Sequence, residues 1–177
     1  MRPLADTDRI RELMRALGRS AREPASVYLT GGASAVLRGW RAATVDVDLR
    51  LEPDDELLRA IAELKERLDI NVELASPLDF VPVASDWRTR SPFIERIGKV
   101  SFHHFDLHGQ ALSKVERGHE QDVADVRTMI ERGDIEAASM WRYYDRVTPE
   151  LYRYPAVDRK ALERGLEALF GPRKAGP

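Results

Sequence analysis

Two glycines and two aspartates are the residues of this sequence whose types and spacing indicate chemistry. Gly31 and Gly32 end a short β-prone run, and Asp46 and Asp48 lie two positions apart further along the chain. Carboxylates at i and i+2 of a strand share a face about 7 Å apart, close enough to hold a pair of divalent ions. Glycines at a strand-to-helix turn let backbone N–H groups approach phosphates, and the following Ser34 adds a hydroxyl donor.

Hard oxygen ligands beside a phosphate partner favour Mg²⁺, and two ions are expected. Each feature alone has an ordinary explanation. Gly-Gly is common in turns, and Asp-Val-Asp is also typical of the solvated face of a half-buried sheet. The order of glycine turn, helix and paired carboxylates is what favours a phosphoryl-transfer site.

An α+β arrangement is expected to position these residues. Residues 44–51 alternate strictly, with Val45, Val47, Leu49 and Leu51 on one face and the two aspartates on the other. Further strands are predicted at 27–30, at 70–74 and within 93–107 around a turn at Gly98. Helices are predicted from the cap Asp6 to Leu17, and over 33–39, 53–68, 111–117, 120–131, 135–146 and 158–170, while 75–91 is expected to be irregular.

The resulting expectation is an α/β core over residues 1–107, a C-terminal helical part over 108–171 packed on that core, and a disordered tail over 172–177. His103 and His104 adjoin on a predicted strand, so their side chains should point to opposite faces. Trp141 and Tyr144 are expected in the core of the C-terminal helices.

The segment TGGASAVLRGWRAATVDVDLRL resembles the signature of the nucleotidyltransferase superfamily, in which Gly-Gly or Gly-Ser and a helix precede a strand bearing Asp-x-Asp. Thirteen residues separate Gly32 from Asp46, at the upper end of that family's spacing. The resemblance implies a short mixed β-sheet flanked by helices. It also implies transfer of a nucleoside monophosphate from an NTP to an acceptor hydroxyl, with Asp46 and Asp48 holding the metals and Gly31, Gly32 and Ser34 the phosphates.

A third acid on a neighbouring strand is usual in that superfamily, as a metal ligand or as the base for the acceptor hydroxyl. Glu73, on the polar face of the predicted strand 70–74, is the choice here. Asp79, in the irregular segment after Pro77, is the alternative. Many relatives have aspartate at this position. The alternative explanation is that Glu73 is a surface strand residue paired with a lysine or arginine.

A second segment, ALSKVERGHEQDVADV, is similar to AbiE-type and MenT-type toxin nucleotidyltransferases. The similarity implies that Lys114 and Arg117 bind the nucleotide and that Lys114 and Asp122 belong to the catalytic centre. Helical spacing places Asp122 and Asp125 beside the buried stripe. Ordinary charge pairs on a surface helix are the alternative explanation.

In the toxin-like branch the acceptor is often a tRNA 3′ end, and a cognate antitoxin commonly accompanies the enzyme. With 28 basic and 30 acidic residues the net charge is -2, so tRNA contact requires a local basic patch, for which Arg153, Arg159, Lys160 and Arg164 are candidates. The alternatives are nucleotidylation of a protein or an aminoglycoside-type small molecule, and a non-catalytic nucleotide-binding regulatory module.

Composition bears on the compartment as well. The sequence has no cysteine, no signal-like N-terminus and no apolar stretch approaching the ~20 residues of a membrane span. A cytoplasmic protein without membrane contact is therefore expected.

Overall fold

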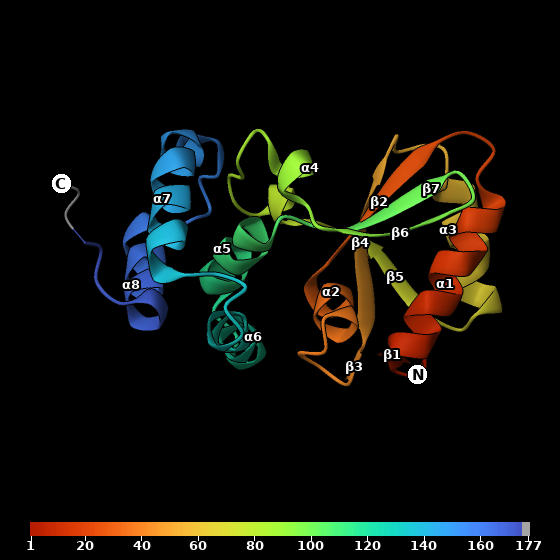
Figure 1. The fold of residues 1–177 in the computed structure, drawn as a ribbon, viewed down its shortest axis with the longest axis horizontal. Coiled ribbons are helices and arrows are strands. Elements are labelled where there is room, and N and C mark those ends of the chain that lie inside the picture. Colours follow the sequence, from red (N-terminus) through yellow and green to blue (C-terminus); the bar gives the residue numbers. More distant parts are fainter. Residues whose placement is uncertain (175–177) are drawn as a thin grey trace. The chain divides into compact units, whose positions relative to one another are not determined.

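A computed structural model describes residues 1–174, so the last part of the tail predicted for 172–177 lies outside the described residues. The chain divides into two compact units (Figure 1). The first, called the sheet unit, consists of Met1–Ser76 and Ser91–Phe105. The second, called the helical unit, consists of Pro77–Arg90 and the chain from Asp106 onward.

The sheet unit contains a five-stranded mixed sheet in the order β5-β4-β2-β7-β6. These strands are β2 (Ala25–Thr30), β4 (Asp46–Glu52), β5 (Asn71–Leu74), β6 (Phe93–Ile97) and β7 (Val100–His104). The central strand β2 pairs antiparallel with β4 and parallel with β7, while β5 runs parallel to β4 and β6 antiparallel to β7. A separate two-stranded sheet joins β1 (Ala5–Asp6) to β3 (Ala43–Thr44). The expected α+β fold with a short mixed sheet is confirmed.

Three helices belong to the sheet unit: α1 (Thr7–Ser20), α2 (Gly31–Leu37) and α3 (Leu58–Arg67). The Asp6 carboxylate caps α1 by accepting a hydrogen bond of 3.0 Å from the Arg9 backbone N–H. The helical period of α1 buries Ile10, Leu13 and Leu17 in one core with the alternate strand residues Val47 and Leu49. Because every second residue of β4 enters this core, Asp46 and Asp48 are left on the opposite face, as predicted.

Two predicted boundaries were wrong. The segment 44–51 is not one strand, because the chain changes from the small sheet at Thr44 to the large sheet at Asp46, and Val45 between them is 58% exposed. The next helix begins at Leu58 rather than Pro53. The preceding residues instead form a connection in which the Glu56 carboxylate accepts backbone hydrogen bonds from Arg22 and Glu23.

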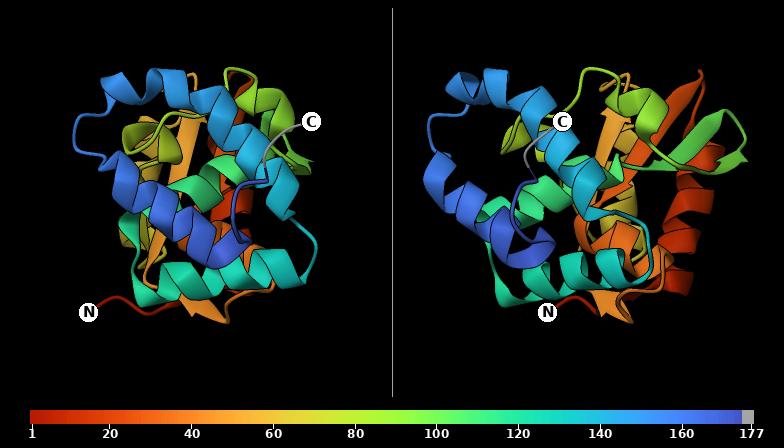
Figure 2. Two further views of the ribbon diagram at one scale, coloured as in Figure 1. Left: turned by 90° about the vertical axis from the view of Figure 1, so that its left-hand side faces the viewer. Right: turned by 60° about the vertical axis from the view of Figure 1, so that its left-hand side comes forward.

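The helical unit contains the four longer helices α5 (Leu107–Arg117), α6 (Glu120–Glu131), α7 (Ala137–Val147) and α8 (Arg159–Phe170), coloured green to blue in Figures 1 and 2. It also contains α4 (Trp87–Arg90) and two 3₁₀ segments, η1 (Pro77–Asp79) and η2 (Thr148–Arg153). The segment 75–91 was predicted to be irregular. It is partly helical because the buried Trp87 anchors it and Ala84 N–H donates to the Tyr143 hydroxyl. Trp141 and Tyr144 are buried, as predicted.

Candidate active site

Strand register brings the predicted acids of the sheet unit to the glycine turn. Asp48 of β4 lies opposite Thr30, the last residue of β2, and on its other side opposite Glu73 of β5. Neighbouring strands are about 4.8 Å apart, and directly opposite residues project from the same face. Thr30, Asp48 and Glu73 therefore form a row across the sheet, and Gly31 follows at the end of that row.

Gly31 and Asp48 are in close contact. Gly31 has φ +54°, a left-handed conformation that glycine adopts without steric cost. A Cβ added there would lie 2.5 Å from Asp48 Oδ2, closer than van der Waals contact allows. The carboxylate thus occupies the space that any side chain at position 31 would need, and it lies directly against the backbone of the turn.

Two residues that sequence reasoning missed lie beside Gly32. A Cβ on Gly32 would overlap Thr44 Oγ1 and would lie 3.3 Å from Arg41 Nη1. The buried Thr44 hydroxyl also donates 3.0 Å to the Asp46 carbonyl, which links the connection before β4 to the start of that strand. Arg41 brings a cation to the turn. In the sequence, this role of Arg41 could have been inferred from its position between the two glycines and the Asp-x-Asp pair.

The turn also presents backbone donors. Helix α2 begins at Gly31, and its N-cap Thr30 makes no side-chain capping hydrogen bond. The N–H groups of a first helical turn have no partner inside the helix, so they are available to an acceptor oxygen. The predicted order of strand, glycine turn and helix is therefore present in the structure.

Ser34 has a different environment from the other residues of the motif. It has 0% exposure, and its Oγ lies 2.9 Å from Nδ1 of the buried His104. His103 points the other way, as predicted, and stacks on Tyr28 with ring centroids 5.1 Å apart. His104 therefore joins β7 to α2 behind the turn, a role that the sequence did not reveal.

The carboxylates of Asp46 and Asp48 are chemically of the kind that hard divalent cations prefer. Asp46 and Asp48 are both partly exposed and project from one face of β4, and carboxylate oxygens are the ligands Mg²⁺ prefers. Glu73 is exposed on the neighbouring strand. Within residues 1–174 no three His, Asp or Glu side chains gather as a ready-made metal site. Asp79, the alternative third acid, is exposed in the helical unit.

The second predicted motif forms a buried ion network between α5 and α6 in the helical unit. Lys114 Nζ lies 2.7 Å from Asp125 Oδ2 and 3.9 Å from Asp122 Oδ1. Arg117 donates to both oxygens of Asp122, at 2.7 and 2.6 Å. Asp122 and Asp125 are each 2% exposed, which confirms that they border the buried stripe. Gln121 supports Asp125 with a hydrogen bond of 3.2 Å.

The network pairs two cations with two carboxylates. Lys114 is only 3% exposed, whereas the Arg117 side chain is 51% exposed. Asp122 holds Arg117 in the planar two-bond geometry that guanidinium groups favour, and Asp125 orients the Lys114 ammonium. The predicted residues Lys114, Arg117 and Asp122 are thus brought together in one cluster.

Comparison with known families gives one match. A model of the family described as "Nucleotidyltransferase of unknown function (DUF6036)" matches residues 7–155, a span that includes the glycine turn, the Asp pair and the ion network. The chain belongs to this family. No curated protein and no solved structure matches the chain. Family membership supports nucleotidyl transfer as its general activity.

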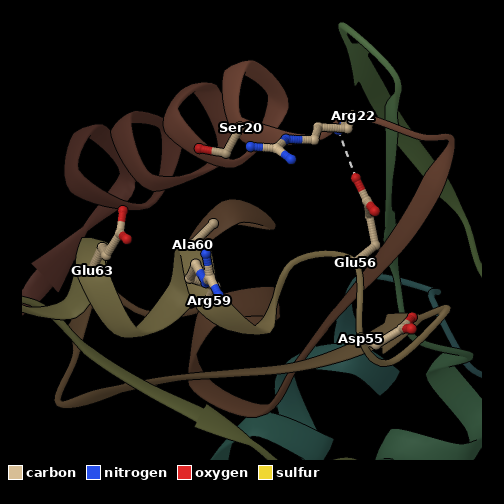
Figure 3. A pocket seen from close by; sticks show the side chains of 7 residues that line it. All are labelled: Ser20, Arg22, Asp55, Glu56, Arg59, Ala60 and Glu63. Carbon is tan, nitrogen blue, oxygen red and sulfur yellow. Dashed lines mark hydrogen bonds between the residues drawn. The ribbon is translucent and has the colours of Figure 1, made fainter.

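The chain also has a hollow of about 640 Å³ beyond the other end of β4 (Figure 3). Its lining combines three acids with two arginines and two small residues: Ser20, Arg22, Asp55, Glu56, Arg59, Ala60 and Glu63. Hydrogen bonds from the backbone N–H groups of Glu23 and Arg22 lower the pKa of Glu56, which favours its charged form. None of the residues predicted for nucleotide transfer lines this hollow.

Among the described residues, no helix combines the length and apolar character that crossing a bilayer requires.

Proposed function

We propose that this chain transfers a nucleoside monophosphate from an NTP to an acceptor hydroxyl, with Asp46 and Asp48 at the reaction centre. The observation that carries the proposal is the contact between Gly31 and Asp48. A carboxylate that lies against a glycine backbone at the first turn of α2 puts carboxylate oxygens and backbone N–H groups in one place, which supports a shared site for a metal ion and a triphosphate. Membership of a nucleotidyltransferase family supports the same activity.

In this proposal Gly31 and Gly32 donate backbone N–H groups to triphosphate oxygens, and Arg41 beside them adds a positive charge. Ser34 keeps its hydrogen bond to His104 and supports α2 from behind. Asp46 and Asp48 would hold Mg²⁺, and a bound divalent ion neutralises the triphosphate and orients it for in-line attack. The acceptor oxygen then bonds to the α-phosphorus as the bond to pyrophosphate breaks.

Glu73 is proposed as the base that receives the proton of the acceptor hydroxyl. Its place directly across from Asp48 on β5 supports this role, and its exposure leaves it accessible to an acceptor. Lys114 is proposed to bind the triphosphate as a point charge oriented by Asp125, with Arg117 as a second nucleotide contact and Asp122 as the group that holds it.

A tRNA 3′ end is the proposed acceptor, and the likeness of the Lys114–Asp125 segment to toxin nucleotidyltransferases supports it. A cognate antitoxin is proposed on the same ground. A hydroxyl on a protein or on an aminoglycoside-type molecule would use the same centre. The complete Asp pair argues against a purely regulatory module, because a non-catalytic copy has no need of both carboxylates.

The experiment incubates the full chain and Mg²⁺ with each α-³²P-labelled NTP and, separately, total tRNA, cell protein or an aminoglycoside. We expect label in tRNA with one or two of the four NTPs. EDTA should abolish labelling, and Asp46→Asn with Asp48→Asn should reduce it by at least about a thousandfold, since removing essential charge stabilisation costs about 4 kcal/mol or more.

The matched control is Asp54→Asn, which removes an exposed carboxylate from the connection after the same strand. It should label like the unchanged chain. Labelling of protein or aminoglycoside alone would replace the tRNA proposal but keep the reaction. Equal labelling by the double Asp variant would refute the proposed reaction centre.

A further inference from the structure

A second polar pocket lies in the helical unit, and nothing in the proposed reaction uses it. The pocket has a volume of about 230 Å³ and is formed by α4, the first turn of α5, and α7. Its lining consists of three arginines and three polar residues: Arg90, His108, Ser139, Arg142, Tyr143 and Arg146. No lining residue is acidic, although the whole chain has a net charge of -2.

One wall of the pocket is rigidly built. Arg90 Nε donates to the buried Asp106 at 3.2 Å, and Arg90 Nη2 lies 3.0 Å from His108 Nδ1. The Tyr143 ring packs under both groups, 5.1 Å from the Arg90 guanidinium and 5.4 Å from the His108 ring. Arg90 therefore faces the pocket in a fixed orientation, with the Nη1 group not used by these two bonds.

Hydrogen bonding also fixes the state of His108. The Ser139 hydroxyl donates to the Glu136 carbonyl at 2.8 Å, so toward His108 Nε2, 3.0 Å away, it accepts. His108 Nε2 thus carries the proton, and Nδ1 accepts from Arg90. Burial and the charges of Arg90 and Arg142 lower the pKa of His108 against the opposing effect of Asp106, which favours this neutral form.

The arginines that line the pocket outnumber the carboxylates that pair with them in the described part of the chain. Asp106 offsets Arg90, and Asp86 pairs with Arg146 at 2.9 Å on the surface. Arg142 is exposed, and no hydrogen bond or ion pair of its side chain occurs within residues 1–174. One guanidinium without a counterion and two partly engaged ones therefore converge on a concavity whose volume equals that of about seven or eight liquid waters.

We propose that this pocket binds a phosphate group. Guanidinium groups match the spacing of phosphate oxygens with paired N–H donors, and clusters of arginines are a recurrent way of recognising phosphorylated ligands. A terminal phosphate carries close to two negative charges, which suits a pocket with several arginines and no lining carboxylate. The group can belong to a free phosphate or to the 5′ end of an RNA.

The test follows the arginine Nε–H signals of the ¹⁵N-labelled full chain by NMR, with EDTA present and ionic strength held constant. The probes are inorganic phosphate, a 5′-phosphorylated hexaribonucleotide and the same hexamer without that phosphate. We expect the Arg90, Arg142 and Arg146 signals to shift with at least one phosphorylated probe. A shift of these signals with inorganic phosphate identifies a free phosphate as the source. A shift with the phosphorylated hexamer only identifies the RNA end as the source.

Arg142→Gln should weaken this binding roughly tenfold or more, because a charged hydrogen-bond partner is lost. Its side chain is exposed and unpaired within the described residues, so folding should persist. Arg127→Gln removes the same charge from the exposed face of α6 and should leave binding within about twofold. Equal weakening by both variants, or unmoved pocket signals with every probe, would overturn the proposal. Because metal and NTP are omitted, the result does not depend on the transfer reaction.

Discussion

Gly31 and Gly133 have similar left-handed backbones, with φ +54° and +73°, but their surroundings differ. A side chain at Gly133 would meet no atom within 4 Å, whereas at Gly31 it would collide with the Asp48 carboxylate. The two positions therefore separate the cost of backbone conformation from the consequence of displacing Asp48. This separation allows a sharp test of the proposed centre.

For Gly133→Ala we expect a loss of about 1 kcal/mol in the free energy of unfolding, from the strained φ alone. Gly31→Ala should cost about 1–3 kcal/mol more, because the added methyl must displace Asp48. Nucleotide transfer should fall at least tenfold in Gly31→Ala only. Urea denaturation and the labelling assay measure these quantities. Similar transfer by the two alanine variants would show that the position of Asp48 against the turn is irrelevant to the reaction.

The residue types of the site were readable from the sequence, but their surroundings were not. Asp46 and Asp48 share a face because alternation along a strand fixes it. Ser34 was predicted as a phosphate donor from its type and its position after the glycines, and only the fold shows His104 beside it, 70 residues away in sequence. Arg41 was missed because a flexible cation in a connection gives no periodic signal.

At the scale of elements, α5 and α6 are joined by ion pairs between their side chains. Lys114 and Asp125 are almost fully buried and meet at 2.7 Å across the two helices. Breaking a buried ion pair by removing one partner leaves an uncompensated charge in a poorly solvated place. Replacing both partners with apolar groups leaves no such charge, so the loss should be smaller.

We therefore expect Lys114→Met to lower the free energy of unfolding by about 3–5 kcal/mol. The double variant Lys114→Met with Asp125→Leu should recover about 1–3 kcal/mol of that loss. Lys160→Met, on the exposed surface of α8, serves as the control and should change stability by less than about 0.5 kcal/mol. Denaturant unfolding of the unchanged chain and these three variants measures the loss and its recovery.

The same variants separate stability from the proposed nucleotide contact. If Lys114 binds the triphosphate, transfer should stay low in the double variant even where its stability recovers. A double variant as active as the unchanged chain would restrict Lys114 to a structural role.

Element types were more predictable than their boundaries. Helix α6 was predicted over its observed span because its apolar stripe is regular and its ends are clear. The start of β4 was misplaced because residues 43–44 also extend, but pair with β1 in another sheet. The short helix α4 was missed because tertiary contacts of Trp87, rather than a repeating pattern over its four residues, hold it in place.

At the scale of the whole molecule, the chain passes between the two units three times, after Ser76, Arg90 and Phe105. The helical unit is consequently built from two separate stretches of sequence. Arg90 at the end of one stretch and Asp106 at the start of the other form an ion pair at 3.2 Å. His108 contacts Arg90 of this ion pair. The protonation state of His108 therefore affects the stability of the contact between the two stretches.

Acidification should destabilise the protein through partly buried histidines in both units. Burial lowers the pKa of His108 in the helical unit and of His103 in the sheet unit relative to an exposed imidazole. Between the folded and unfolded pKa values the unfolded chain binds more protons, so stability increases with pH in that range. The histidine contribution is thus fully present above the unfolded pKa of about 6.5 and is lost as pH falls toward the folded values.

His108→Gln should reduce the decline in unfolding free energy between pH 7.5 and 5.5, because glutamine keeps a polar side chain but has no proton to gain. His119→Gln, at an exposed position before α6, should leave the decline unchanged. Urea denaturation at several pH values measures the decline, and NMR titration of the imidazole signals tests the pKa directions.

Bound phosphate should raise the pKa of His108, since an anion opposes the charges of Arg90 and Arg142 that lower it. A His108 signal that titrates above the range of an exposed histidine in the phosphate-free protein would contradict the neutral, hydrogen-bonded state assigned to it.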